Sequence, residues 1–296
     1  MVTDTAERPA RGTRPETRDV TELRALKTRH PELADAVDLH LGLLELQRRI
    51  QARVSLPWFE FTAETLERHH AEARPLLEFD RIPLDVSDLR LAVRQTADVL
   101  RRFGALDEAE YERVQTIGRD PKLPDVARRW FDGAIARQVA ALGTQPSSPA
   151  AEAANGMADE VLALSMRPFL ARCAEVLQQR PELQAWGHPL CALCFGEPDL
   201  AVITPAAERH LVCGRCGLQW NWEPLACPYC RNSDRARITS FATPDGHYRV
   251  YGCDACHRYL KAFDGRHASR PVMPVVDAVA TLPLDAAAQQ RGYSAS

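Results

Sequence analysis

The chain has 296 residues, 45% of them hydrophobic, and a formal net charge of -3 at pH 7. This length suits one large or two modest domains, and the apolar fraction is ordinary for a protein with a packed core. The small net charge gives no sign of a surface that binds polyanions along the whole chain. A membrane-spanning helix needs about 18 consecutive apolar residues, and no segment of the chain comes near this length. Membrane insertion is therefore not expected.

The first segment, residues 1–19, mixes charged residues with Pro and Gly and has no apolar stretch. It is expected to be a disordered tail and not a secretory signal. Paired cysteines in a chain without such a signal favour a reducing compartment. A cytoplasmic location is therefore expected.

Residues 20–182 are predicted to form an all-helical domain. Apolar residues follow one helical face at spacings of four, three, four and four: Leu39, Leu43, Leu46, Ile50 and Val54. Further helices are expected at 62–79, 87–103, 107–117, 123–142 and about 162–176, with a loop at 143–149. Cys173 lies on the apolar stripe of the last helix and is expected to be a small buried hydrophobe. His69 and His70 have charged neighbours and are expected to face solvent.

The remaining eight cysteines form four Cys-x-x-Cys pairs within 66 residues: Cys191/Cys194, Cys213/Cys216, Cys227/Cys230 and Cys253/Cys256. A tight turn lets two cysteines at this spacing bind one metal ion, with sulfur at about 2.3 Å. Four pairs therefore predict two centres, each with four thiolate ligands. Because tetrahedral sulfur suits both zinc and iron, the identity of the two ions stays open.

Short strands are predicted between the cysteine pairs. The segments 200–204 and 209–212 flank one turn, and 237–243 and 247–251 flank Pro244-Asp245-Gly246, a strong turn signal. Each hairpin thus lies between two pairs, as in a zinc ribbon or rubredoxin. The predicted fold class is α+β: the helical domain, a first rubredoxin-like module at 187–222, a second at 223–270, and an extension at 271–296 with a helix at 277–290.

The gap lengths favour pairing in chain order. Between Cys194 and Cys213 lie 18 residues and between Cys230 and Cys253 lie 22, whereas only 10 separate Cys216 from Cys227. The first centre is accordingly assigned Cys191, Cys194, Cys213 and Cys216, and the second Cys227, Cys230, Cys253 and Cys256. A closed four-thiolate shell leaves no position for substrate, so neither centre is expected to catalyse hydrolysis.

Other chemistries find little support in the residues. The Cys227-Pro228-Tyr229-Cys230 pair superficially resembles a thiol–disulfide exchange motif, but it precedes a hairpin and lies among three further pairs. No phosphate-binding, dinucleotide-binding, serine-hydrolase or zinc-protease motif is found, and no enzymatic activity is expected. Trp220 and Trp222 either cover the ribbon core or form a surface for a partner.

Several of these segments resemble the formate dehydrogenase accessory protein FdhE family. The resemblance rests on residues 187–194 (GHPLCALC), 209–216 (RHLVCGRC) with Trp220, 253–261 (CDACHRYLK), and 277–281 (DAVAT) with Gly292-Tyr293. The chain departs from the family pattern at Phe195, where Gly is usual, which puts the shape of the first cysteine turn in question.

The resemblance implies a non-enzymatic assembly factor, or chaperone, that binds the catalytic subunit of formate dehydrogenase in the cytoplasm. Two alternatives remain: a nucleic-acid-binding zinc-ribbon protein, and a rubredoxin-like redox protein. From residue 187 onward, 11 Lys and Arg stand against 10 Asp and Glu. Eight thiolates on two divalent ions would make this half negative, which speaks against nucleic acid as the partner.

Overall fold

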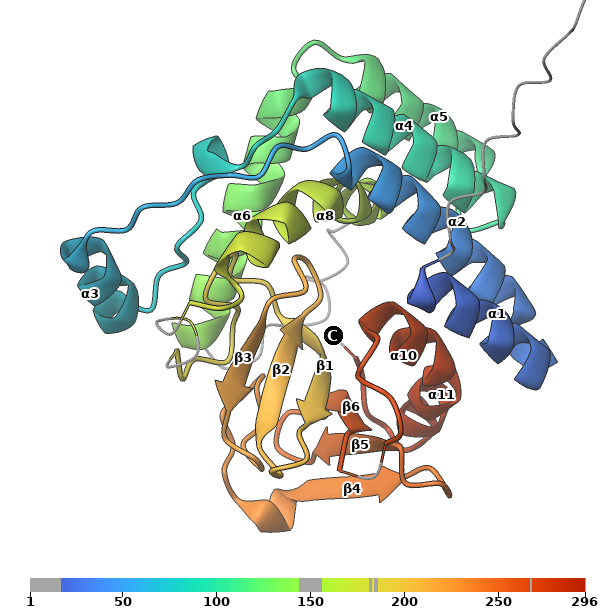
Figure 1. Ribbon diagram of the computed structural model, residues 1–296, viewed down its shortest axis with the longest axis vertical. Helices are drawn as coiled ribbons and strands as arrows, with labels where there is room; N and C mark the ends of the chain where they lie inside the picture. Colours follow the sequence, from blue (N-terminus) through green and yellow to red (C-terminus); the bar gives the residue numbers. More distant parts are fainter. Residues whose placement is uncertain (1–16, 144–155, 181–182, 184–185, 267, 296) are drawn as a thin grey trace, which may run out of the picture.

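The computed structural model describes residues 17–143, 156–180, 183, 186–266 and 268–295. The expected tail therefore lies largely outside the described residues, as does the loop at 144–149. Helices form one layer and a sheet with two further helices forms the other (Figure 1). Among the described helices, none is both long and apolar enough to cross a membrane.

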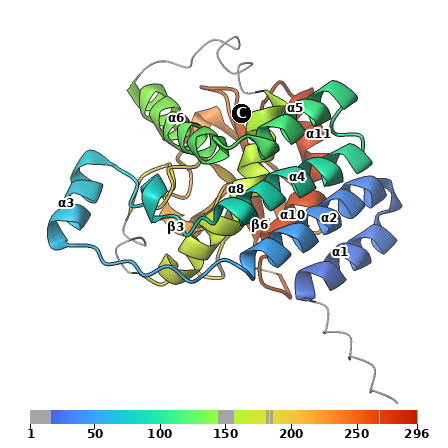
Figure 2. The ribbon, with the colours of Figure 1, turned by 90° about the horizontal axis from the view of Figure 1, so that it is seen from above.

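The helical layer contains the helices that the sequence predicts, one of them shorter and one longer than expected, and a further helix at 18–29 for which no separate range was predicted. Its helices are α1 (Arg18–Arg29), α2 (Ala34–Gln51), α3 (Ala63–Glu72), α4 (Val86–Arg102), α5 (Glu108–Arg119), α6 (Leu123–Gly143) and α8 (Met157–Leu177), with short 3₁₀ turns at Pro31–Leu33 and Phe79–Arg81. In the view of Figure 2, α1, α2 and α4 lie side by side. The predicted stripe of α2 is buried at Leu43, Leu46 and Ile50.

Local capping explains where several helices begin. The Asp85 carboxylate accepts hydrogen bonds from the backbone N–H groups of Ser87 and Asp88 at the start of α4. Asp107 and Glu110 form a reciprocal capping box at the start of α5. Such caps satisfy N–H groups that have no partner inside the helix, and each contributes about 1 kcal/mol.

The helix predicted at 62–79 is too long. Thr62 caps α3 as expected, but α3 ends at Glu72 because Ala73 takes the left-handed conformation (φ 49°) and Pro75 cannot continue the helix. The chain then runs to the sheet side of the molecule. There the N–H groups of Leu76 and Leu77 donate to the carbonyls of Ala192 and Leu193 at 3.0 and 2.9 Å.

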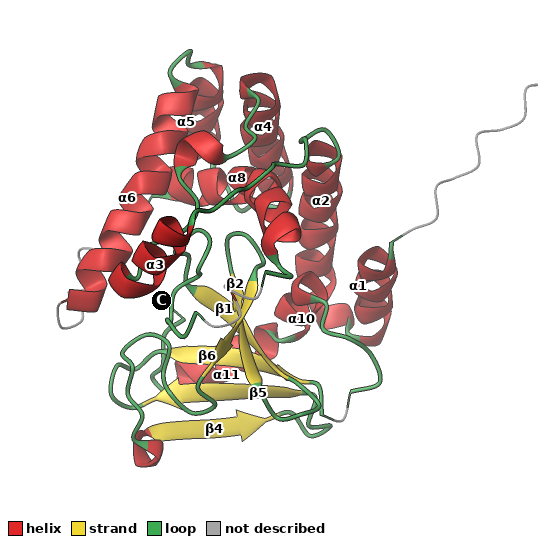
Figure 3. Ribbon diagram, turned by 60° about the vertical axis from the view of Figure 1, so that its left-hand side comes forward, coloured by secondary structure: helices red, strands yellow, loops and turns green. Residues whose placement is uncertain are grey.

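A six-stranded sheet carries all eight paired cysteines at its strand ends and turns. The strands are β1 (Pro198–Ile203), β2 (Arg209–Cys213), β3 (Gln219–Trp222), β4 (Ile238–Ala242), β5 (Tyr248–Cys253) and β6 (Tyr259–Asp264), preceded in the second half by a 3₁₀ turn at Arg235–Arg237. Their order is β3-β2-β1-β6-β5-β4 (Figure 3). Both predicted hairpins are present, as β1–β2 and β4–β5.

The two halves of the sheet are joined by a parallel pair. β1 and β6 run alongside each other from Leu200↔Lys261 to Ile203↔Asp264. Each half is an antiparallel meander of cysteine pair, hairpin, cysteine pair and third strand. The two expected modules, divided at residues 222 and 223, therefore contribute strands to one continuous sheet. Its edge strands are β3 and β4.

The C-terminal extension forms two helices that lie between the sheet and the first helices of the chain. The single helix predicted at 277–290 is divided into α10 (Pro274–Ala280) and α11 (Leu282–Gln290) at the buried Thr281, because Pro283 lacks an N–H group for a continuing helix. Apolar side chains of α10 pack on α1 and α2 in one cluster: Leu23, Leu26, Leu33, Val37, Leu44, Met273, Val276 and Val279. The extension thus joins the sheet to the first helices of the chain.

Candidate metal centres

The four cysteine pairs fold into four copies of one turn. In each copy the N–H of the residue after the second cysteine donates to the carbonyl of the first cysteine, at 2.8–3.0 Å. That residue has a positive φ: 58° at Phe195, 76° at Gly217, 59° at Arg231 and 56° at His257. The turn at Phe195 matches the one at Gly217, so the missing glycine does not reshape the first turn.

The first cluster lies inside the core between the helices and the sheet. Cys191, Cys194, Cys213 and Cys216 are at most 3% exposed. Their sulfurs lie within 4.8 Å of one another, with Cys191–Cys216 at 3.6 Å and Cys194–Cys213 at 3.5 Å. Backbone N–H groups point at two of them: Arg215 to the Cys213 sulfur at 3.4 Å and Leu218 to the Cys216 sulfur at 3.5 Å. Such bonds stabilise thiolates.

The backbone comes unusually close to the first cluster at Gly196. A Cβ at this position would lie 2.8 Å from the Cys213 sulfur. Only glycine therefore fits here without displacing the sulfur.

The second cluster lies nearer the surface. Cys227 and Cys253 are buried, but Cys230 is exposed and Cys256 is half-buried. The sulfurs again lie within 4.8 Å of one another, with Cys227–Cys256 at 3.7 Å and Cys230–Cys253 at 3.6 Å. The grouping of the eight cysteines agrees with pairing in chain order. The two clusters have the same local geometry and differ in their access to solvent.

The closely packed thiols of each cluster differ widely in pKa. Burial raises the pKa of Cys191 and Cys216 well above the usual range. At Cys213 burial acts in the same direction, but hydrogen bonds from Cys191 and its neighbours prevail and lower the pKa well below it. A hydrogen bond from Cys256 lowers the pKa of Cys227 to about 5. Each group thus favours at least one thiolate, and a divalent ion would displace the remaining protons.

The donor sets fit zinc or iron. Four sulfurs around a common centre are the ligands that tetrahedral zinc and rubredoxin-type iron take. Because cysteine fills all four positions, neither cluster offers an open position for a substrate or an activated water. Such centres hold segments together or, with iron, pass electrons.

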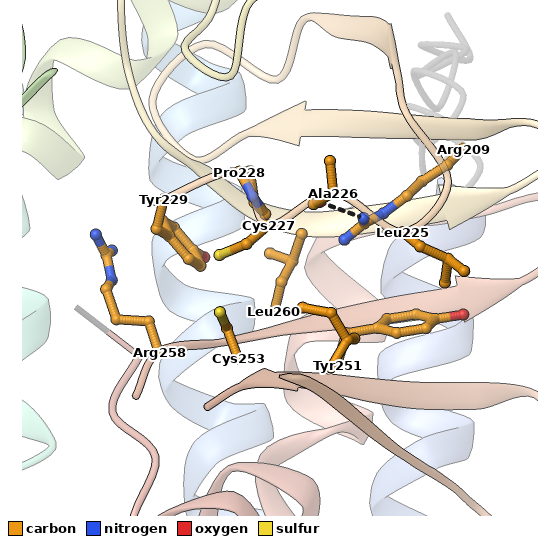
Figure 4. A pocket seen from close by; sticks show the side chains of 11 residues that line it. Arg209, Leu225, Ala226, Cys227, Pro228, Tyr229, Tyr251, Cys253, Arg258 and Leu260 are labelled. Atoms are coloured by element: carbon orange, nitrogen blue, oxygen red, sulfur yellow. Dashed lines mark hydrogen bonds between the residues drawn. The ribbon is translucent and has the colours of Figure 1, made fainter. Parts of the chain in front are cut away.

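An ion pair couples the two clusters. Glu197, which follows the first turn, accepts two hydrogen bonds from Arg258, which follows the fourth, at 3.0 and 2.8 Å. The Arg258 guanidinium also lies 3.6 Å from the ring centre of Tyr229, between Cys227 and Cys230. Figure 4 shows Arg258 beside Tyr229, with the sulfurs of Cys227 and Cys253 facing each other. The first turn is thus tied to both turns of the second cluster.

Beside this junction Arg209 is buried, with 4% of its surface exposed. Its guanidinium donates to the carbonyls of Pro224 and Ala226 and lies over the ring of Tyr251 (Figure 4). Arg209 therefore holds the link between the two halves of the sheet against β5.

Two further expectations from the sequence meet different outcomes. Cys173 is fully buried in the helical core, and burial raises its pKa to about 12, so it is an inert thiol as predicted. His70 is exposed as predicted, but His69 is only 2% exposed, which corrects the expectation that both face solvent. His69 stacks on Trp186 with ring centres 4.0 Å apart.

The sequence reasoning missed a row of rings beside the first cluster. Trp186 continues to His188, with ring centres 5.3 Å apart, and His188 stacks on Phe195 at 5.3 Å. Trp220 is fully buried and donates from Nε1 to the His188 carbonyl at 2.8 Å, so it covers the core as one of its two readings predicted. His69 and Trp186 are 117 positions apart, so no local sequence pattern could have indicated that their rings stack.

The fold and its sites define a class of protein: a helical region followed by a sheet-rich part that carries two four-cysteine clusters. No family model matches the chain. A relative named "Protein FdhE homolog" from Haemophilus ducreyi is 28% identical over 135 residues, which cover 45% of this chain and 43% of that protein. "Protein FdhE" from Escherichia coli is 28% identical over 109 residues, or 36% of this chain and 35% of that protein. The chain thus matches less than half the length of these relatives.

A solved structure extends the likeness along the chain. The crystal structure of the FdhE protein from Pseudomonas aeruginosa aligns with a TM-score of 0.59 at 20% identity, over 94% of this chain and 92% of that one. At this identity the alignment shows the fold. The chain is thus similar in sequence to relatives named FdhE over part of its length, and in fold to the FdhE protein from Pseudomonas aeruginosa.

Proposed function

We propose that this chain is an accessory protein for formate dehydrogenase, which assists the maturation of that enzyme without catalysing a reaction of its own. The proposal is supported by the likeness to proteins named FdhE, in fold and over the sequence matches. The observation that carries it is the pair of closed four-cysteine clusters on one sheet beneath a helical layer. By this proposal the chain works as a chaperone in the cytoplasm and binds the catalytic subunit.

Each cluster is proposed to hold one zinc or iron ion that stabilises the fold. The free energy of binding would supply about 10 kcal/mol or more of folding free energy at each site, as for other structural zinc sites. Elemental analysis of gently purified protein should give close to two metal ions per chain. The cysteine assignment has its own test: Cys213→Ser should empty the first centre and leave the second occupied. Absence of metal together with free alkylation of all eight cysteines in the native state would contradict the proposal.

The maturation role is tested by deleting the gene in the source organism. Formate dehydrogenase activity should fall sharply, while the messenger RNA of its catalytic subunit stays at the normal level. Complementation with the wild-type gene should restore activity, and complementation with Cys191→Ser/Cys194→Ser should not. Unchanged activity with normal enzyme abundance would refute the accessory role.

Exposure of the second centre favours one further candidate, a rubredoxin-like redox role. Cys230 is exposed and Cys256 half-buried, so an iron ion there would exchange electrons with a partner at short range. The test is to reconstitute the protein with zinc alone, which has no redox chemistry in this setting. If the zinc form supports maturation in a cell-free assay as well as the iron form does, electron transfer is excluded from the role.

Nucleic acid is not proposed as a partner. Basic and acidic residues are in near balance from residue 187 onward, and thiolates on divalent ions add negative charge. Salt-dependent binding of DNA or RNA by the metal-loaded protein would oppose this view.

A further inference from the structure

A groove of about 630 Å³ lies where the two halves of the sheet-rich part meet. One wall is the segment 187–189, which leads into the first cysteine turn. The opposite side includes Asn221 and Trp222 at the end of β3, and Arg231, which directly follows Cys230. Neither cluster lies in the groove, but both hold its walls in place.

More hydrogen-bond donors approach the His188 ring at this groove than the ring can accept. Only 9% of the residue is exposed. Its Nδ1 accepts a hydrogen bond from the backbone N–H of Leu190 at 3.2 Å. A backbone N–H can only donate, and a neutral imidazole ring has a single lone pair, so Nε2 carries the proton if Nδ1 accepts this bond.

The neighbour of Nε2 is also a donor. The Arg231 guanidinium lies 3.0 Å from it, and a guanidinium has no lone pair to offer. Burial, and next the charge of Arg231, lower the pKa of His188 to about 4, so the ring is neutral at pH 7. Leu190 and Arg231 therefore both direct a donor at a ring with one lone pair, so one of these two donors has no acceptor on His188. An anion at the groove would accept from Arg231 and leave the lone pair of the ring to Leu190.

The neighbouring edge of the sheet offers backbone groups as well. β3 is an edge strand, and its outward-facing backbone groups at Gln219 are bonded to the side chain of Gln178. In the register of β2 and β3, alternate residues pair inward, so Asn221 faces outward like Gln219. Within the described part of the chain, Asn221 makes no backbone hydrogen bond outside the strand pairing of β2 and β3. One N–H and one C=O therefore stand open at the groove.

We propose that this groove binds an extended peptide segment of a partner protein through a carboxylate side chain that accepts hydrogen bonds from Arg231, beside His188. The peptide backbone pairs with Asn221 at the open edge of β3, and Trp222 lies under the neighbouring side chains. Pairing along an exposed strand edge is a common mode of peptide recognition. That the partner is immature formate dehydrogenase rests on the proposed function, whereas carboxylate-dependent peptide binding does not.

The exposed carboxylate of Glu223 also lines the groove. It would repel an acidic peptide, in the opposite sense to Arg231. Substitutions at these two positions should therefore change the affinity for an acidic peptide in opposite directions. This gives the test a sign as well as a magnitude.

The test uses the full chain loaded with metal and two end-blocked pentapeptides, VTEVT and VTQVT, titrated by calorimetry. The first should bind about ten-fold more tightly or better, since a charge-assisted pair is lost with the second. Arg231→Gln should remove this preference and Arg231→Lys should keep most of it. Glu223→Gln should tighten binding of VTEVT. The matched control is Arg235→Gln, at an exposed position outside the groove, and should change nothing.

Metal content is measured for every variant, so that loss of the second centre is recognised as the cause if it occurs. Equal affinity of the two peptides for the wild type, or a preference that survives Arg231→Gln, would overturn the proposal. Sodium acetate is the third ligand: if it binds as tightly as VTEVT, the strand edge contributes nothing and a free small carboxylate is the ligand instead. A normal gene-deletion phenotype with intact peptide binding would refute the proposed function alone.

Discussion

The two clusters are expected to release metal at different rates, because only one of them is sealed. When fully loaded protein is mixed with excess EDTA, we expect two phases of about one ion each. The second centre should empty first, since the chelator can reach the exposed Cys230 directly. In the first centre every cysteine is at most 3% exposed, so the turn must open before a chelator arrives.

The structure gives the expected difference between the two release rates. Opening the first turn breaks the hydrogen bonds from Leu76 and Leu77 to the carbonyls of Ala192 and Leu193. At about 1 kcal/mol each, this costs about 2 kcal/mol. A free-energy difference of about 2 kcal/mol corresponds to a rate about 30-fold slower.

Release is followed with a chromogenic metal indicator. The double change Cys227→Ser/Cys230→Ser should abolish the fast phase and leave the slow phase unchanged. A single phase for both ions, or a slow phase that disappears with these two substitutions, would show that burial does not control release.

Three further outcomes follow from named contacts. Gly196→Ala should lower occupancy of the first centre only, because its Cβ would come within 2.8 Å of the Cys213 sulfur; metal content of the purified variant decides this. Asp277→Ala should lower the free energy of unfolding by about 3–5 kcal/mol in urea, since the buried carboxylate pairs with an arginine and two further donors; a loss below 1 kcal/mol would contradict the estimate. Burial lowers the pKa of His69 to about 4, so the unfolded chain binds its proton first as pH falls below 6.5. Between pH 7.5 and 5.5 the wild type should lose about 1 kcal/mol of stability relative to His69→Phe, measured by urea unfolding at both values; equal losses would refute the assignment.

The cysteine turns could be predicted because their geometry is local. Each turn is closed by backbone hydrogen bonds over five or six positions, and the spacing of the two cysteines is sufficient to specify it. Even Phe195 accepts the left-handed conformation, at a cost of about 1–2 kcal/mol that closure of the turn must offset. The two hairpins could be predicted for the same reason, because the residues of their turns indicate them.

Contacts between distant segments could not be predicted in this way. The parallel pair β1–β6 joins residues about sixty positions apart, and the sequence of neither strand specifies which other strand it pairs with. The same holds for the packing of α10 on α1, which joins segments about 250 positions apart. Pro75 does mark a break after α3 in the sequence, but the predicted helix ran past it to Phe79. Leu76 and Leu77, within the range predicted as helix, are instead buried in the same core as the first cysteine turn.

The different surroundings of the two clusters assign them different tasks within one fold. The first cluster lies in the same apolar core as the helices, so its ligands connect the helical layer to the sheet. The second lies nearer the surface, and the residue that follows its second cysteine, Arg231, lines the groove. Glu197 and Arg258 link the turns of the two clusters. A metal at the first centre would thus maintain the fold, and a metal at the second would hold the turn that carries Arg231, at the surface proposed to bind a peptide.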